Sequence, residues 1–173
     1  MKEIQTTHMK SGSVSSDEYY TPISLIESLG HFDYDPCTPK NSKWRTADIM
    51  LTKEDDGLAH DWHGRVWLNP PYSAPLISQF MQKMAKHGSG IALVVPKFGS
   101  KMFREWVFPY AKGIFILDKR IKFYDINWIQ QKSPICQSVL IAYSEDDISA
   151  IIKSGNEGTM LYLNRDIAIS KNE

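Results

Sequence analysis

Short apolar runs alternate with amphipathic stretches along most of the chain. Ile91 to Val95 is an unbroken apolar run, which is typical of a parallel strand buried on both faces. Between about Pro75 and Gly88 the apolar residues recur at helical spacing, so we expect an amphipathic helix that ends at the glycine. Similar patterns predict strands at 31–35, 65–68, 113–117, 119–124, 138–143 and 159–163. They also predict helices at 22–29 (with Thr21 as N-cap), 101–108 and 146–153.

This alternation of strands and helices predicts an α/β fold with a mostly parallel sheet and helices on both faces. Proline, asparagine and glycine punctuate residues 36–61, where we expect loops and one short helix. Residues 1–16 lack an apolar period and are predicted to be a flexible N-terminal tail ahead of a single domain at 17–173. Ligands of such sheets bind at the carboxyl ends of the strands. The segments expected there are Asp35-Pro36-Cys37, Asn69-Pro70-Pro71-Tyr72 and Pro96-Lys97-Phe98.

Composition narrows the class of protein. The chain has 173 residues, of which 42% are apolar, and this fraction excludes disorder throughout. No stretch approaches the ~18 consecutive apolar residues that a membrane span requires, and the first residues lack the apolar run of a signal peptide. The two cysteines, Cys37 and Cys136, are too few for a disulfide framework or a cysteine zinc site. We therefore expect a cytoplasmic protein that does not contact a membrane.

The charges are unevenly distributed although the formal net charge is zero. Residues 62–124 contain 10 Lys or Arg and 2 Asp or Glu, whereas the segments before and after them are acidic. A basic segment of this kind indicates a surface that meets an anion, of which nucleic acid is the commonest large example. Lysines on solvated helix faces are the alternative explanation.

The tetrapeptide Asn69-Pro70-Pro71-Tyr72 lies between an expected strand and an expected helix. An aromatic amino group is a poor nucleophile because its lone pair is delocalised into the ring. The Asn69 side-chain oxygen and the Pro70 carbonyl can each accept one of its two N–H bonds, which favours a pyramidal nitrogen. The prolines hold that carbonyl in place, and Tyr72 offers a flat face on which a base can stack. A Pro-Pro turn beside a buried tyrosine is the structural alternative.

This tetrapeptide resembles the (Asp/Asn/Ser)-Pro-Pro-(Tyr/Phe/Trp) signature of S-adenosylmethionine-dependent methyltransferases that act on an exocyclic or amide nitrogen. Four other segments extend the resemblance: 17–22, 33–37, 54–58 and 119–124. In this order, the five motifs resemble the phage-type family of Dam-like DNA N6-adenine methyltransferases over residues 17–143. The resemblance implies a Rossmann-like methyltransferase fold, S-adenosylmethionine as methyl donor, and a flipped-out adenine in DNA as acceptor. It suggests protection of phage DNA in the host cytoplasm.

The resemblance also implies roles for individual residues. Asn69, Pro70 and Tyr72 would be catalytic, and the cofactor-binding residues would be Tyr20, Thr21, Pro22, Asp35, Cys37, Asp56 and Asn69. The segment after the first expected strand departs from most methyltransferases because it contains no glycine. Asp35 could bond the amino group or ribose of the cofactor, or cap the turn before Pro36. Asp56 could bond the ribose hydroxyls or the adenine amino group, or remain a solvated charge.

The expected nucleic-acid contacts cluster in the basic segment and the tetrapeptide. They are Pro71, Tyr72, Lys97, Arg120, Lys122, Phe123 and Tyr124. Arg120 and Lys122 would neutralise phosphates, while Phe123 or Tyr124 packs on the flipped adenine. In a strand, Ile121 and Phe123 would share one face and could equally be core residues.

Other chemistries fit less well. His60 and His63 have no Cys or third His nearby, so we expect no metal. Cys37 lacks a His or Asn at a recognisable offset, which argues against a nucleophile. Cytosine N4, RNA adenine and protein glutamine remain alternative acceptors, although the basic segment argues against protein. A non-catalytic nucleic-acid-binding module on the same fold is the alternative outside enzymes. We expect a monomer or weak dimer that recognises DNA through loops.

Overall fold

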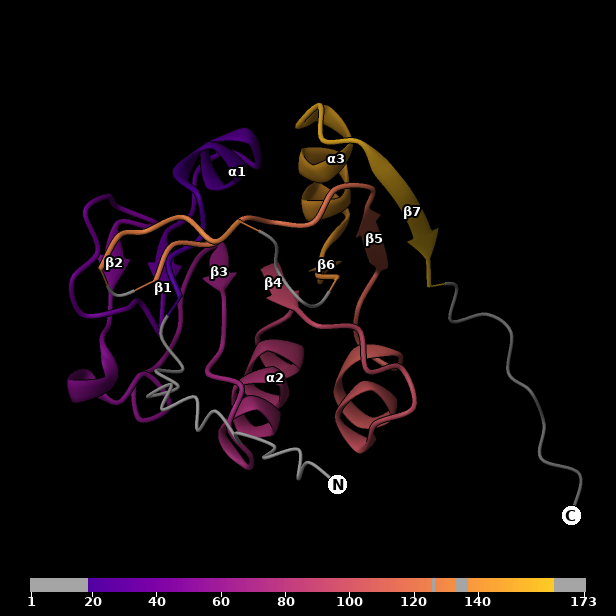
Figure 1. Ribbon diagram of the computed structural model, residues 1–173. Coiled ribbons are helices and arrows are strands. Elements are labelled where there is room, and N and C mark those ends of the chain that lie inside the picture. The colour runs from indigo at the N-terminus through magenta and orange to yellow at the C-terminus, as the bar shows by residue number, and fades with distance from the viewer. Residues whose placement is uncertain (1–18, 126, 133–136, 164–173) are drawn as a thin grey trace, which may run out of the picture.

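The computed structural model describes residues 19–125, 127–132 and 137–163, which form a seven-stranded sheet with helices packed against it (Figure 1). The strands are β1 (Tyr34–Asp35), β2 (Ile49–Met50), β3 (Val66–Leu68), β4 (Gly90–Val94), β5 (Gly113–Leu117), β6 (Val139–Ala142) and β7 (Gly158–Tyr162). The helical elements are α1 (Ile23–Ser28), the 3-10 turn η1 (Lys53–Asp55), α2 (Leu76–His87), the π-helical turn η2 (Phe103–Val107) and α3 (Glu145–Lys153). The predicted tail at 1–16 lies outside the described residues. None of the helices within these ranges is long and apolar enough to cross a membrane.

The sheet has the strand order β2-β1-β3-β4-β6-β5-β7 and mixed directions. Strands β1 to β4 are parallel, whereas β6 is antiparallel to both β4 and β5, and β7 is antiparallel to β5. The prediction of a mostly parallel sheet is therefore wrong. All residues of β6 are buried, and a strand buried on both faces has the same apolar sequence whichever way it runs. Its direction follows from its return between β4 and β5, which no local pattern encodes.

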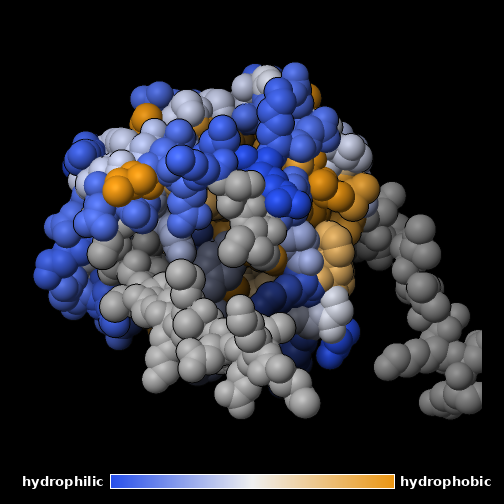
Figure 2. Space-filling view, viewed as in Figure 1, coloured by the Kyte–Doolittle hydropathy of each residue, from blue (hydrophilic) through white to orange (hydrophobic). Residues whose placement is uncertain are grey.

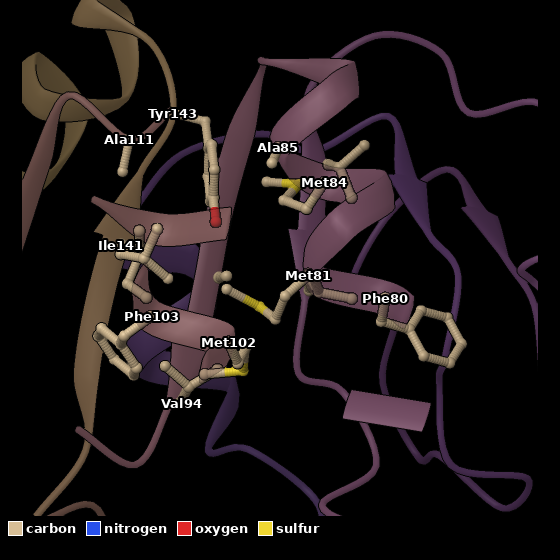
Figure 3. Packing of buried hydrophobic residues seen from close by; sticks show 14 of the residues in the cluster. Phe80, Met81, Met84, Ala85, Val94, Met102, Phe103, Ala111, Ile141 and Tyr143 are labelled. Atoms are coloured by element: carbon tan, nitrogen blue, oxygen red, sulfur yellow. The ribbon is translucent and has the colours of Figure 1, made fainter. Parts of the chain in front are cut away.

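Helices cover both faces of the sheet, as predicted. Side chains alternate along β4, so Ala92 and Val94 pack into the core under α2 and η2, whereas Ile91 and Leu93 pack under α1 and α3. Figure 1 shows these two pairs of helical elements on opposite sides of the row of strands. Met81 of α2 lies completely buried in the first of these cores (Figure 3). The fold class is thus α/β with two apolar layers, one on each face of the sheet.

An ion pair anchors the amino ends of the central strands to α3. Arg65, just before β3, donates from Nε to Asp147 Oδ1 at 2.7 Å. Asp147 Oδ2 accepts a hydrogen bond from the backbone N–H of Gly90, the first residue of β4, also at 2.7 Å. Because α3 binds this end of β3 and β4, the opposite, carboxyl ends remain available for ligands.

Three local predictions require correction. Residues 119–124 do not form a strand, since only Tyr124 pairs, through isolated bridges to Tyr20 and Gln130, while Ile121 is buried in the core. Thr21 does not cap α1, because Pro22 occupies the N-cap position and the Thr21 hydroxyl instead accepts a bond from the Asn69 side chain. The segment 36–61 contains strand β2 in addition to the expected short helix. In each case a long-range partner overrides the local pattern.

Candidate active site

Strand β3 delivers the Asn69-Pro70-Pro71-Tyr72 loop to the carboxyl edge of the sheet. All three residues of β3 are buried between its neighbours β1 and β4. The two prolines end the strand because they have no N–H to donate to a ladder. Helix α2 begins at Leu76, so the loop lies between two well-packed elements. This packing fixes the position at which Asn69 leaves the core.

The Asn69 side chain is oriented by one hydrogen bond and leaves its oxygen unpaired. Its Nδ2 donates to Thr21 Oγ1 at 3.3 Å. Its Oδ1 is buried, and no described residue donates a hydrogen bond to it. No described residue donates to the Pro70 carbonyl either. A buried acceptor without a partner costs about 1–3 kcal/mol, so two neighbouring unpaired acceptors mark a place where a ligand with N–H donors can bind.

The Cys37 thiol holds the backbone of this loop. Its Sγ–H donates to the Asn69 carbonyl oxygen with a separation of 3.2 Å. Burial, and then the neighbouring carboxylate of Asp35, raise the pKa of the Cys37 thiol well above its ordinary value. The thiol therefore remains protonated and acts as a donor. This geometry supports the interpretation that Cys37 is not a nucleophile.

Asp35 places a buried carboxyl group at the carboxyl end of β1. Only 2% of this residue is exposed. Burial raises the pKa of Asp35 to about 6, and hydrogen bonds from the Thr46 hydroxyl and the Cys37 N–H partly oppose that rise. The bond from the Cys37 N–H, 3.0 Å long, shows that Asp35 also caps its turn. The sequence did not reveal Thr46, whose partner lies eleven residues away.

These groups surround one small hollow. Five of the predicted cofactor residues line it, together with Trp44 and Thr46. The five are Tyr20, Thr21, Asp35, Cys37 and Asn69. The hollow has a volume of about 260 Å³, which is below the range of about 300–1,000 Å³ that is usual for ligand pockets. A large ligand can therefore enter only if part of the lining moves.

The two remaining predicted cofactor residues lie outside the lining. Pro22 is on the far side of Thr21, where it faces a second hollow. Asp56 is exposed, and its Oδ1 accepts a hydrogen bond from the Leu58 N–H at 3.3 Å. The neighbouring Gly57 nevertheless packs directly on Pro36, since a Cβ at Gly57 would lie 1.9 Å from the Pro36 carbonyl oxygen. The Asp56 segment is thus beside the Asp35 turn, although its carboxylate does not point into the described hollow.

An aromatic cluster covers the hollow, and the sequence indicated it only weakly. Trp128 stacks on Tyr20 with ring centroids 4.2 Å apart, and Trp44 contacts the edge of Trp128 at 4.8 Å. Tyr124 packs against both tryptophans. Trp128 has φ 63°, a left-handed conformation that is unusual for a bulky residue. Two tryptophans in otherwise polar loops were the available signal, but only the tertiary structure brings them together.

The predicted nucleic-acid contacts do not form one continuous surface. Pro71 and Tyr72 are half-buried in the loop after β3, whereas Lys97 is exposed after β4. The remaining four follow β5. Arg120 and Lys122 are exposed, Phe123 packs against Tyr19 and the core under α1, and Tyr124 joins the aromatic cluster.

Potential metal ligands are not organised into a site. His60 Nε2 lies 2.9 Å from the backbone oxygen of Asp55, and the ring of His63 packs on the Tyr34 ring. His31, Asp33 and Asp48 bring ligand atoms within 4.8 Å of one another, but they are at least partly exposed and already form ion pairs. Exposed groups of this kind are common on protein surfaces without an ion.

Comparison with known proteins identifies the family. A sequence model of the family described as DNA N-6-adenine-methyltransferase (Dam) matches residues 8–170. The chain belongs to the Dam family. A Dam-family relative, the DNA N-6-adenine-methyltransferase of Haemophilus phage HP1 (strain HP1c1), is 32% identical over 97 residues, which are 53% of this chain and 54% of the relative. The chain thus spans about half the length of the curated relative that it matches, and no solved structure matches it.

Membership of the Dam family confirms the resemblance drawn from the five motifs. The family match is also wider than the 17–143 range over which those motifs were found. Three of the motifs contribute residues to the hollow, through Tyr20 and Thr21, Asp35 and Cys37, and Asn69. These motifs are distant in the sequence and meet only because β1 and β3 are neighbours in the sheet.

Proposed function

We propose that this protein transfers a methyl group from S-adenosylmethionine to the N6 amino group of adenine in DNA. The observation that carries the proposal is the buried, unpaired Oδ1 of Asn69 beside the unpaired Pro70 carbonyl. The exocyclic amine of adenine has two N–H donors, so it can satisfy both acceptors at once. The Dam-family match supports adenine in DNA as the acceptor.

The chain's contribution to catalysis would be orientation. Asn69 Oδ1 and the Pro70 carbonyl accept the two N6 hydrogens, which directs the nitrogen lone pair away from both. Thr21 and Cys37 keep the amide and the backbone of Asn69 in place, since each forms a hydrogen bond to that residue. Neither acceptor is a base, so the proton released from the nitrogen passes to solvent. Tyr72, in the same loop, would stack on the extruded adenine.

The donor set of the hollow fits the proposed cofactor. When bound, S-adenosylmethionine supplies a methyl group on a positively charged sulfur that is open to in-line displacement. The Asp35 carboxyl group is buried at the carboxyl end of β1, where it can accept hydrogen bonds from ribose hydroxyls or an amino group. The aromatic rings of Tyr20 and Trp44 provide apolar walls. The volume of the hollow implies that the aromatic cluster moves outward as the cofactor enters.

The topology also supports a Rossmann-like methyltransferase domain. The first four strands are parallel, and β5 has the same direction because both β4 and β5 are antiparallel to β6. The carboxyl ends of β1, β3, β4 and β5 therefore share one edge of the sheet, where ligands of open α/β sheets bind. We propose that the protein acts as a monomer or weak dimer in the cytoplasm, where its DNA substrate is accessible.

The central experiment is replacement of Asn69 with alanine. Asn69→Ala should reduce methyl incorporation into DNA by at least about 100-fold, as expected for loss of an aligned polar group, while calorimetry shows nearly unchanged cofactor binding. Asn41→Ala, at an exposed asparagine, is the matched control and should retain full activity. If cofactor affinity falls in parallel with activity, Asn69 has a structural role instead.

The acceptor is tested with the wild-type protein and labelled cofactor. Incorporation should require adenine in the DNA and should be absent with RNA or protein. Incorporation into DNA that lacks adenine would indicate cytosine N4 as the acceptor. Lack of incorporation into any nucleic acid, despite DNA binding, would favour a non-catalytic binding module.

A further inference from the structure

A second hollow lies on the other side of the Tyr20–Tyr124 bridge. It has a volume of about 490 Å³, nearly twice that of the first, and lies between α1, the segment after β5 and the turn after α3. Leu25, Leu117 and Ile121 form a buried apolar floor. The size and the floor are suited to a flat, partly apolar group such as a nucleobase.

The rim of this hollow is cationic. Lys119 and Glu157 form an ion pair at 2.5 Å, which balances two of the lining charges. Arg120 and Lys122 are both exposed on the same wall, and Glu157 is the one acidic residue among the described lining residues. Figure 2 shows strongly hydrophilic side chains over the segment that crosses between α1 and α3. The rim therefore favours an anion such as a phosphodiester.

Asn156 supplies an oriented polar group to the same hollow. Its Nδ2 donates to Ser28 Oγ at 2.9 Å and to Ser154 Oγ at 2.7 Å. These two bonds fix the amide, and its Oδ1 receives no hydrogen bond from any residue in the described ranges. An amide held in this way can accept a hydrogen bond from the N–H edge of a base.

The two hollows are adjacent along one stretch of chain. Tyr20 and Thr21 line the first, and Pro22 lines the second. Reciprocal backbone hydrogen bonds of 2.9 and 3.0 Å join Tyr20 to Tyr124, two residues after Lys122. A strand whose target base enters the first hollow would therefore pass the second within a short distance.

We propose that the second hollow binds the nucleotide next to the target adenine on the same DNA strand. Its phosphate lies against Arg120 and Lys122, its base rests on the apolar floor, and Asn156 Oδ1 accepts from the N–H edge of that base. This inference rests on the proposed function, since it assumes that the target adenine enters the first hollow. It assigns sequence recognition to the α1–α3 side of the protein.

Base recognition is tested with a library of duplexes in which the bases around one adenine are randomised. Wild-type protein should prefer a base with an exposed N–H donor at one neighbouring position, and Asn156→Ala should reduce that preference at least fivefold at that position alone. Ser28→Ala is the matched control, since Ser154 still holds the amide, and it should keep the preference. An unchanged sequence profile for Asn156→Ala would overturn the assigned reading of the base.

Phosphate binding is tested separately from methylation, with a fluorescent duplex titrated at several salt concentrations. Arg120→Ala combined with Lys122→Ala should lower affinity for all sequences and reduce the salt slope by about two phosphate contacts, each worth about 0.9 log units. Lys53→Ala, in η1, should leave the slope unchanged. An unchanged slope for the double variant would overturn the proposed groove. If no adenine is methylated but the slope falls as expected, the groove binds DNA and the proposed function fails instead.

Discussion

Replacing Asp35 with asparagine should remove a loss of stability that the wild-type protein undergoes between about pH 4 and pH 6. Burial raises the folded-state pKa of Asp35 from 3.8 to about 6. The folded state therefore holds the proton more tightly than the unfolded state, so stability decreases as pH rises through this window. Above about pH 6 the protein carries the full cost of a buried carboxylate.

The expected magnitude follows from the size of the pKa shift. A shift of about two pKa units, at about 1.4 kcal/mol per unit, corresponds to about 3 kcal/mol. Asparagine has the same shape as aspartate and retains an oxygen that can accept from the Cys37 N–H. The substitution therefore removes the ionisable group with little change in packing.

The assay is denaturant unfolding of both proteins at several pH values from 4 to 8. The free energy of unfolding of Asp35→Asn, relative to wild type, should rise by about 3 kcal/mol between about pH 4 and pH 7. Asp118→Asn, at an exposed aspartate, is the control and should change the relative stability by less than about 0.5 kcal/mol. Parallel stability curves for wild type and Asp35→Asn would refute the argument that burial dominates at this site.

Two other substitutions test the base pocket and the Asp35 turn. Tyr72→Ala should weaken extrusion of the target base more than overall duplex binding; a fluorescent adenine analogue at the target should brighten with wild type, and an equal signal with the variant would remove Tyr72 from the pocket. Gly57→Ala should destabilise the protein by about 1–3 kcal/mol in denaturant unfolding, because its Cβ would overlap the Pro36 carbonyl. Gly99→Ala, where a Cβ meets nothing within 4 Å, should be nearly neutral, and similar losses for both glycines would contradict the overlap.

The sequence by itself determined the elements that depend on local patterns. The apolar stripe and the closing glycine predicted α2, and the short apolar run predicted β3. The prolines after Leu68 marked the end of β3 and hence the position of the Asn69 loop. Strand termination by proline and helix termination by glycine act within a few residues, so they can be recognised without knowledge of the fold.

The tertiary structure alone decided which distant groups meet. The apolar run of β6 indicated burial but not its antiparallel direction, and the pattern at 119–124 resembled a strand although Ile121 turns into the core. The unpaired oxygen of Asn69 exists only because Thr21, 48 residues away, binds the amide nitrogen. The raised pKa of Asp35 likewise reflects burial, which depends on every element packed around it. Hydrogen-bond satisfaction and desolvation are properties of the assembled environment, whereas helix and strand propensity are largely properties of the local chain.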